Sequence, residues 1–530
     1  MDFKNLVETT VYKTLKSLKP FDLKTGLTSQ RIIDASIPAG GRLFYNWATM
    51  PIGSEHLELL AQLAEEQQLV DKYQALVSGA IMNTGERRMV LHHLTRGNLL
   101  LGNQTVIADG EDKLAFYQEQ LHRIEAFSKA VRDGNITGST GKQIKTVVQI
   151  GIGGSDLGPR ALYQALKGWC VHKNIDILEA RFISNVDPDD PTDILTGLDF
   201  ETTLFILVSK SGTTQETLTN QKFVLKAMRA QNIDGFNPAS HVIAVTSKTS
   251  PLAKSNAVLD SFYIDDYIGG RYSSTSAVGA VVLSLAFGFD TFKRLLSGAH
   301  EADVNALEKD ICKNAALLDA LIGVYLRNVL QLPCTAVLPY AQALSRFPAH
   351  LQQLDMESNG KRVNRDGKLL NYPTGPVIFG EPGTNGQHSF YQHLHQGTDT
   401  IPIQFIGFLD SQRQNDVVTD GSTSQEKLIA NLIAQIVAFA CGKIDDNPNK
   451  QFPGNRYSSL LYAKRLTPET LGALLAHFEN KVMFQGFIWN VNSFDQEGVQ
   501  LGKTLAGKIL SGGNSDEVLK AYIELFSRLK

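Results

Sequence analysis

The sequence has few features of a secreted, disulfide-bonded or zinc-binding protein. Its 530 residues include only 4 cysteines, at positions 170, 312, 334 and 441, and none lies in a CxxC or Cys…His spacing. This scatter favours reduced thiols over disulfides or a structural zinc. The first 20 residues carry scattered charges and no apolar core, so we expect no secretory signal.

A long hydrophobic run and an excess of positive charge are also lacking. The longest apolar stretch, about residues 276–289, is shorter than the roughly 20 residues that cross a bilayer, so it predicts a buried helix. The formal net charge is -3, which provides no basic field for nucleic acid. We therefore expect a cytoplasmic protein without nucleic-acid or membrane partners, in which any anionic ligand meets a local group of cations.

The hydrophobic pattern divides the chain into a mostly helical segment and a segment of alternating strands and helices. The chain is too long to fold around a single hydrophobic core, because domains usually run to about 100–200 residues. Residues 1–110 look mostly helical, without a strong strand, and should pack on the core. Beyond them, β-branched runs alternate with helical stretches, which is typical of a parallel sheet covered on both faces. The runs are 146–150, 204–208 and 241–246, and the helices are 157–166 and 216–229.

A second α/β unit of similar plan follows. Its predicted strands are 335–339, 376–379 and 401–408, and its predicted helices are 301–330 and 424–442. The C-terminal part reads as helical again, with Thr467 as an N-cap before Pro468. We place a first α/β domain at 111–285 and a second, with the C-terminal helices, at 286–530.

Two loops that follow predicted strands are suited to bind phosphate. The first, 151–156, has the sequence GIGGSD, whose glycines permit close backbone approach and whose Ser155 adds a hydroxyl before a helix N-terminus. A dinucleotide fingerprint would need glycine where Asp156 stands. The second, 209–214, has the sequence SKSGTT, which combines four hydroxyls with Lys210. Spacing alone does not decide which hydroxyls touch a ligand.

Moving a carbonyl between neighbouring sugar carbons needs a base, a cation beside the enediolate and an acid–base pair that opens the ring. Glu357 is a candidate base, with Asp355 as the competing carboxylate and a surface turn as the alternative reading. Arg271 follows two glycines and is a candidate cation, although a structural ion pair is equally compatible with the motif. None of this chemistry requires a metal or cofactor.

Further acid–base candidates lie later in the second unit. His388 lies in a loop that opens a helix, where an imidazole suits ring opening. His393 and His395 point to different faces of a helix, so we expect no metal site. If 496–503 is helical, Gln496, Gln500 and Lys503 share one face, which could also be a simple solvated surface.

Six motifs together resemble the glucose-6-phosphate isomerase (phosphoglucose isomerase) family. They occur in the family's order and span about 350 residues. The motifs are GIGGSDLGP at 151–159, SKSGTTQET at 209–217, IGGRYS at 268–273, QQLDMESNGK at 352–361, GTNGQHSFYQ at 383–392 and FDQEGVQLGK at 494–503.

The resemblance implies an α/β fold of two sugar-isomerase-type (SIS) three-layer domains with parallel or mixed sheets, helical N- and C-terminal segments, and a homodimer with shared active sites. It implies that Glu357 is the base, that Arg271 stabilises the enediolate, and that Lys503 opens the ring with His388 of the neighbouring subunit. The implied substrate-binding residues are Gly154, Ser155, Ser209, Lys210, Ser211, Gly212, Thr213, Thr214, Gln353 and Gln496.

This sequence departs from the family's usual residues at four positions. Gln500 stands in place of Glu, Glu497 in place of Trp, Gly212 in place of a bulkier residue and Gly85 in place of Thr. We expect Gly212 to make the phosphate loop more mobile and Gln500 to change the electrostatic setting of Lys503.

The implied activity is interconversion of glucose 6-phosphate and fructose 6-phosphate in glycolysis and gluconeogenesis. Two alternatives remain: a sugar-phosphate sensor, which would lack the catalytic groups, and a related amino-sugar or mannose-phosphate isomerase.

Overall fold

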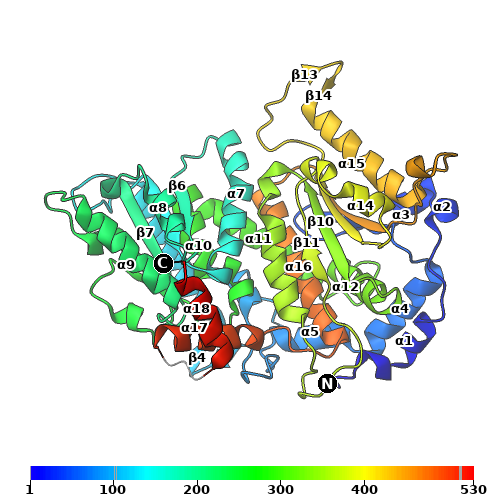
Figure 1. Cartoon of the computed structure of the whole chain (residues 1–530), viewed down its shortest axis with the longest axis horizontal. Helices are drawn as coiled ribbons and strands as arrows, with labels where there is room; N and C mark the ends of the chain where they lie inside the picture. Colours follow the sequence, from blue (N-terminus) through cyan, green and yellow to red (C-terminus); the bar gives the residue numbers. More distant parts are fainter. Residues whose placement is uncertain (1, 101, 103, 513–515, 530) are drawn as a thin grey trace.

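The computed structural model describes residues 2–100, 102, 104–512 and 516–529. Two large β-sheets lie side by side, with helices between and around them (Figure 1). The first sheet has five parallel strands in the spatial order β6-β5-β7-β8-β9. They are β5 (Thr146–Ile150), β6 (Glu179–Ile183), β7 (Thr203–Val208), β8 (Val242–Thr246) and β9 (Ser261–Tyr263).

Helices cover both faces of this sheet, as the alternating pattern predicts. Val148 and Leu207 pack with Met228 on one face, whereas the neighbouring Val147 and Ile206 pack on the other, because successive strand residues point to opposite faces. The apolar run forms a helix whose residues are all buried. The helices are α8 (Asp189–Leu195) and α9 (Gln215–Ala230) on one face, and α6 (Lys113–Arg132), α7 (Leu157–His172) and α10 (Ala277–Phe287) on the other.

The second sheet is mixed and has six strands in the order β1-β2-β15-β12-β10-β11. Four of them run parallel: β10 (Cys334–Tyr340), β11 (Val377–Phe379), β12 (Ile403–Phe408) and β15 (Ser458–Ala463). One face is covered by α12 (Ala315–Val324) and α16 (Pro468–Ile488), the other by α14 (Tyr391–Gln396) and α15 (Ser424–Cys441). The fold is thus α/β with two three-layer units.

The expectation that residues 1–110 contain no clear strand is wrong. β1 (Ser36–Pro38) and β2 (Phe44–Asn46) extend the second sheet, and β2 pairs antiparallel with β15. Each is only three residues long, too short for a period-two pattern to be visible. The helices of this segment are α1 (Thr10–Leu15), α2 (Leu23–Gly26), α3 (Ser29–Asp34), α4 (Ser54–Glu66) and α5 (Leu69–Val77).

The helical stretch expected at about 301–330 is present but interrupted. α11 (Phe289–Asn305) ends early, and Asn314 caps α12 by accepting a 3.0 Å hydrogen bond from the Leu317 N–H. The predicted cap of α16 is confirmed, because Thr467 accepts from the Thr470 N–H at 3.3 Å. The C-terminal helices are α17 (Gln500–Leu510) and α18 (Glu517–Ser527). Within the described ranges, every helix is too short or too polar to cross a membrane.

α11 and α16 lie between the two sheets and cross at very short range (Figure 1). Glycines make this approach possible. A Cβ on Gly298 of α11 would lie 1.8 Å from the Glu469 carbonyl oxygen, and one on Gly472 of α16 would lie 1.9 Å from the Leu295 carbonyl oxygen. At these two positions the helices meet backbone to backbone, without an intervening side chain.

We predict that Gly472→Ala lowers the free energy of unfolding by about 1–3 kcal/mol, because its methyl group must push two helix backbones apart. Gly507→Ala is the matched control, since Gly507 lies within α17 and a Cβ there meets nothing within 4 Å. That change should be neutral or stabilising through helix propensity. Thermal and denaturant unfolding measure both; equal effects would contradict the prediction.

Candidate functional site

A cavity of about 450 Å³ lies where the two units and the N-terminal segment meet. The loops after β5 and β7 form one wall. The chain passes from β5 to β6 on one side and then returns to β7 on the other, so this is the switch point at which open α/β sheets bind ligands. Eight predicted site residues line it together: Gly154, Lys210, Thr214, Arg271, Gln353, Glu357, Gln496 and Lys503.

The hydroxyls of the loop after β7 bond to one another. Ser209 Oγ lies 3.0 Å from Thr214 Oγ1, and Ser211 Oγ lies 2.8 Å from Thr213 Oγ1. Thr214 is the N-cap of α9, but its side chain makes no capping hydrogen bond. The first turn of α9 therefore keeps free N–H groups beside rotatable hydroxyls, which is an arrangement suited to an anion.

Lys210 supplies the cation of this loop. Its Nζ lies 3.6 Å from Asp266, and both side chains line the cavity. Both are substantially exposed, so the pair is weakly held and can rearrange when an anion arrives. Ser155 lies in η3 (Gly153–Ser155), just before α7, and does not itself line the cavity.

Two glycines fix the loop geometry for steric reasons. A Cβ on Gly154 would lie 2.1 Å from the Gly270 carbonyl oxygen, so the β5 loop can approach the Arg271 loop only without a side chain. Gly212 has φ +69°, a left-handed conformation that favours glycine, and a Cβ there would lie 2.1 Å from Ser250 Oγ. Gly212 is thus required by a tight turn; the expected extra mobility remains a prediction.

Arg271 and Glu357 form the polar centre of the cavity. Arg271 lies in η7 (Gly270–Thr275), and its side chain is 1% exposed, compared with 22% for Glu357. Its Nη1 donates to Glu357 Oε2 at 3.2 Å and to Gln496 Oε1 at 3.1 Å. The remaining donors contact Ser358 Oγ at 2.6 Å and the carbonyl oxygens of Ser493 at 2.6 Å and Asp495 at 2.9 Å.

These bonds hold the guanidinium in one orientation, with a single nitrogen directed to the cavity. Lys361 adds to the restraint, because its Nζ donates to the Asp495 carbonyl oxygen at 2.7 Å and to its carboxylate at 2.5 Å. A fixed cation beside a carboxylate is the arrangement that stabilises developing negative charge without reorganisation.

The geometry separates the two candidate bases. Both lie in the π-helix η10 (Gln352–Glu357), which continues from α13 (Phe347–Leu351). Glu357 lines the cavity with Gln353, whereas Asp355 is buried and lines a different hollow on the other side of the helix. Only Glu357 can therefore reach a ligand in the cavity.

The expected helical face of Gln496, Gln500 and Lys503 is wrong in part. Gln496 lies outside the helix, with φ -150°, and α17 begins only at Gln500. Gln496 reaches the cavity through its bond to Arg271, and Lys503 reaches it from the exposed α17. Two separate backbone segments thus bring them to one place.

His388 does not line the cavity of its own chain. It lies exposed in η11 (Asn385–His388), before α14. His395 is engaged elsewhere, because its ring stacks on Phe439 at 3.7 Å and its Nε2 lies 2.8 Å from Gln435 Oε1. Among the described residues, no three His, Cys, Asp or Glu side chains form a group that could hold a metal ion.

Sequence reasoning missed several residues of this site. Asn83 and Glu86 reach the cavity from the N-terminal segment, for which the sequence analysis predicts packing on the core and no site residue. Asp266 and Tyr267 precede the IGGRYS glycines, so their position beside that motif was an available signal. Ser358 follows Glu357 directly, but only the fold shows that it anchors Arg271.

Comparison with known proteins matches this geometry to one family. The family described as phosphoglucose isomerase matches residues 46–523. Glucose-6-phosphate isomerases of Treponema denticola and Treponema pallidum are 56% and 58% identical to this chain, covering 99% of it and 99% and 98% of theirs. A solved glucose-6-phosphate isomerase from Chlamydia trachomatis superimposes with TM-score 0.92 at 42% identity, covering 99% of this chain and 100% of its own. The chain belongs to the phosphoglucose isomerase family.

Proposed function

We propose that this cavity catalyses the reversible isomerisation of D-glucose 6-phosphate to D-fructose 6-phosphate through a cis-enediolate. The observation that carries the proposal is the 3.2 Å pair of Glu357 and Arg271, placed across one cavity from the hydroxyl-rich loop after β7. The names of the relatives at 56% and 58% identity support the same reaction.

The phosphate binds at the loops after β5 and β7. Ser155, Ser209, Ser211, Thr213 and Thr214 supply hydroxyls, and Lys210 supplies the charge. The mutual bonds of these hydroxyls are exchanged for bonds to phosphate oxygens, so few donors are left unpaired in either state. Gly154, Gly212, Gln353 and Gln496 shape the remaining walls.

The proton transfer takes place at the other end of the cavity. Glu357 removes the proton from C2 of the open-chain aldose and returns it to C1, while the oxygens of C1 and C2 share the negative charge of the intermediate. Arg271 Nη1 lies beside Glu357 and stabilises that charge.

Ring opening needs an acid and a base at the ring oxygen and the anomeric hydroxyl. Lys503 is available within the chain, whereas His388 is exposed and lies outside the cavity lining. A further hollow of about 770 Å³ adjoins Glu357, between Gln352 and Val499. We propose that the chain forms a homodimer in which the loop carrying His388 of one protomer enters this hollow of its partner.

As part of the same proposal, the enzyme acts in the cytoplasm, in glycolysis and gluconeogenesis. The four cysteines are free, in keeping with a reducing compartment. A sugar-phosphate sensor is a weaker reading, since it gives no role to a buried arginine directed at a carboxylate. No observation favours an amino-sugar or mannose-phosphate substrate.

We predict that Glu357→Gln lowers kcat by about 10²–10⁴-fold, because the amide cannot accept the C2 proton. Binding of fructose 6-phosphate, measured by calorimetry, should change little, since the phosphate loops are intact. Turnover is measured with EDTA present, by coupling glucose 6-phosphate formation to a dehydrogenase.

Glu86→Gln is the matched control for that experiment. It is the same substitution in the same cavity, at a carboxylate that pairs with Arg88 and Asn83 and has no role in the proposed chemistry. Its kcat should stay close to that of the unchanged protein. Surviving turnover in Glu357→Gln, or activity that depends on the chelated metal, would contradict the proposal.

A second prediction concerns the shared active site. Glu357→Gln and His388→Ala should each be nearly inactive alone. When they are mixed, unfolded and refolded together, about half of the dimers are hybrids with one intact site of two, which restores about a quarter of full activity. If His388 acts within its own chain, the mixture stays as inactive as its components.

A further inference from the structure

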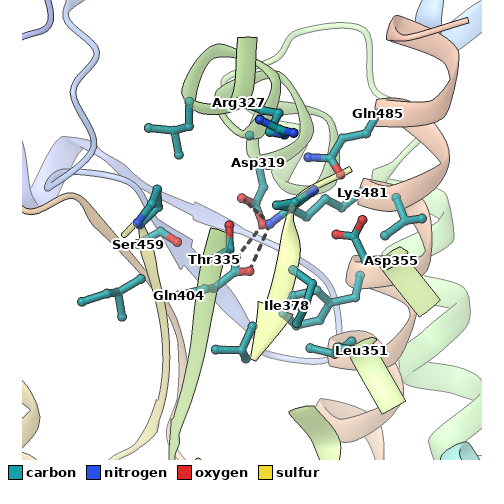
Figure 2. Close-up of a pocket in the computed structure, with 18 of the residues that line it drawn as sticks. Asp319, Arg327, Thr335, Leu351, Asp355, Ile378, Gln404, Ser459, Lys481 and Gln485 are labelled. Atoms are coloured by element: carbon teal, nitrogen blue, oxygen red, sulfur yellow. Dashed lines mark hydrogen bonds and ion pairs between the residues drawn. The ribbon is translucent and has the colours of Figure 1, made fainter. Parts of the chain in front are cut away.

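A second, smaller hollow of about 40 Å³ lies in the interior directly behind the catalytic π-helix. A buried water needs about 10–15 Å³, so the hollow has room for two or three. η10 forms the partition between this hollow and the active-site cavity. Gln353 and Glu357 line the active-site cavity. Leu354 and Asp355 line the hollow, where Figure 2 shows Asp355.

The charges at the bottom of the hollow are already paired. Lys481 Nζ lies 3.1 Å from Asp319 and donates to Gln404 Oε1 at 3.0 Å, as the dashed lines in Figure 2 mark. His477 Nε2 lies 3.0 Å from the same aspartate. Burial alone would raise the pKa of Asp319, but Lys481 and His477 lower it overall. The positive charge of Lys481 is therefore already paired with the carboxylate of Asp319.

Within the part of the chain that the structure describes, Asp355 faces this hollow without a side-chain hydrogen-bond partner. The residue is 6% exposed, and its Oδ1 is buried and makes no hydrogen bond. Gln485, on α16 across the hollow, also leaves its Oε1 unbonded. Two buried oxygens that lack donors in one hollow indicate that water fills it, because unsatisfied buried polar atoms are costly.

The protonation state of Asp355 follows from its surroundings. Burial raises the pKa of Asp355 to about 7; Lys481 opposes this rise and Asp319 adds to it. Arg327 is the other charged group on the lining, and its Nε is engaged by the Thr374 carbonyl oxygen at 2.8 Å. Because Lys481, the cation that opposes this rise, is already paired with Asp319, the carboxyl is a neutral acid below about pH 7 and can then donate a hydrogen bond.

We propose that Asp355 is a positioning residue for Glu357, because its carboxyl ties η10 to α16 through Gln485 and the waters of the hollow. Asp355 and Glu357 are two residues apart in a single turn of π-helix, so a shift of one carries the other. Misplacement of a catalytic group by about 1 Å can cost about 10²-fold in rate. The inference rests on the proposed role of Glu357 as the base.

Three variants test the kinetic part. Asp355→Asn keeps a neutral hydrogen-bonding group and should retain most of kcat. Asp355→Leu keeps the approximate volume but cannot hydrogen-bond, and it should lower kcat about tenfold or more while KM for fructose 6-phosphate changes little. Thr335→Val is the control, because it removes a hydroxyl from the same hollow on β10, away from η10, and should leave both constants unchanged.

The protonation state is tested without turnover. An unfolded Asp titrates near pH 4, so the wild-type native state loses stability as the pH rises from about 4 to about 7, and the loss is complete above that. The Asn side chain of Asp355→Asn does not titrate in this range. The Tm of the variant minus the Tm of the wild type should therefore rise from about pH 4 to about pH 7 and stay constant above that. The infrared band of a protonated carboxyl should be present in wild type at pH 6, fade through about pH 7 and be missing in Asp355→Asn.

The outcomes separate this inference from the proposed function. Full kcat in Asp355→Leu, or equal losses in Asp355→Leu and Asp355→Asn, overturns the positioning role. A Tm difference that is constant from pH 4 to 8, with no carboxyl band, overturns the neutral acid. Surviving turnover in Glu357→Gln instead refutes the role of Glu357, whatever the infrared and Tm measurements give.

Discussion

The contact between Arg271 and Glu357 is the constraint on which the rest of this protein depends. A guanidinium that is 1% exposed is tolerated only when its donors are satisfied, and here a serine hydroxyl, two carbonyl oxygens, an amide oxygen and a carboxylate satisfy them. Those partners are Glu357, Ser358 and residues 493–496, so one side chain contacts a segment that is more than 200 residues away in sequence.

A buried network of ion pairs anchors the loop that carries Arg271. Thr275 of the same loop accepts a 3.1 Å hydrogen bond from Arg96 Nε, and Arg96 forms buried ion pairs with Asp303 of α11 at 3.1 Å and with Glu479 of α16. Burial of these charges is costly unless each is paired, so the network strongly favours one arrangement. The close contact between α11 and α16 therefore helps to fix the position of the loop that carries Arg271.

Backbone geometry places the loops and the two carboxylates of the site. The Gly154–Gly270 approach brings the loop after β5 against the Arg271 loop, and η10 presents one carboxylate to the cavity and another to the interior. Two chemically similar acids in one turn therefore have different environments, because one is half-buried beside a cation and the other is enclosed where Lys481 is already paired.

The sequence by itself determined the α/β class, most central strands and the two strand-end loops, because β-branched runs, glycines and hydroxyl clusters act over a few neighbouring residues. It did not reveal β1, β2, β6, β9 or β15, which are short or interrupted by polar residues and are strands only because a neighbour completes their hydrogen bonds. The family resemblance pointed to Glu357 rather than Asp355, but tertiary structure decided that Glu357 and not Asp355 lines the cavity, that Gln496 lies outside the helix that carries Lys503, and that His388 is exposed. Each depends on which face of a helix meets which cavity, and that is set by long-range packing rather than by residue type.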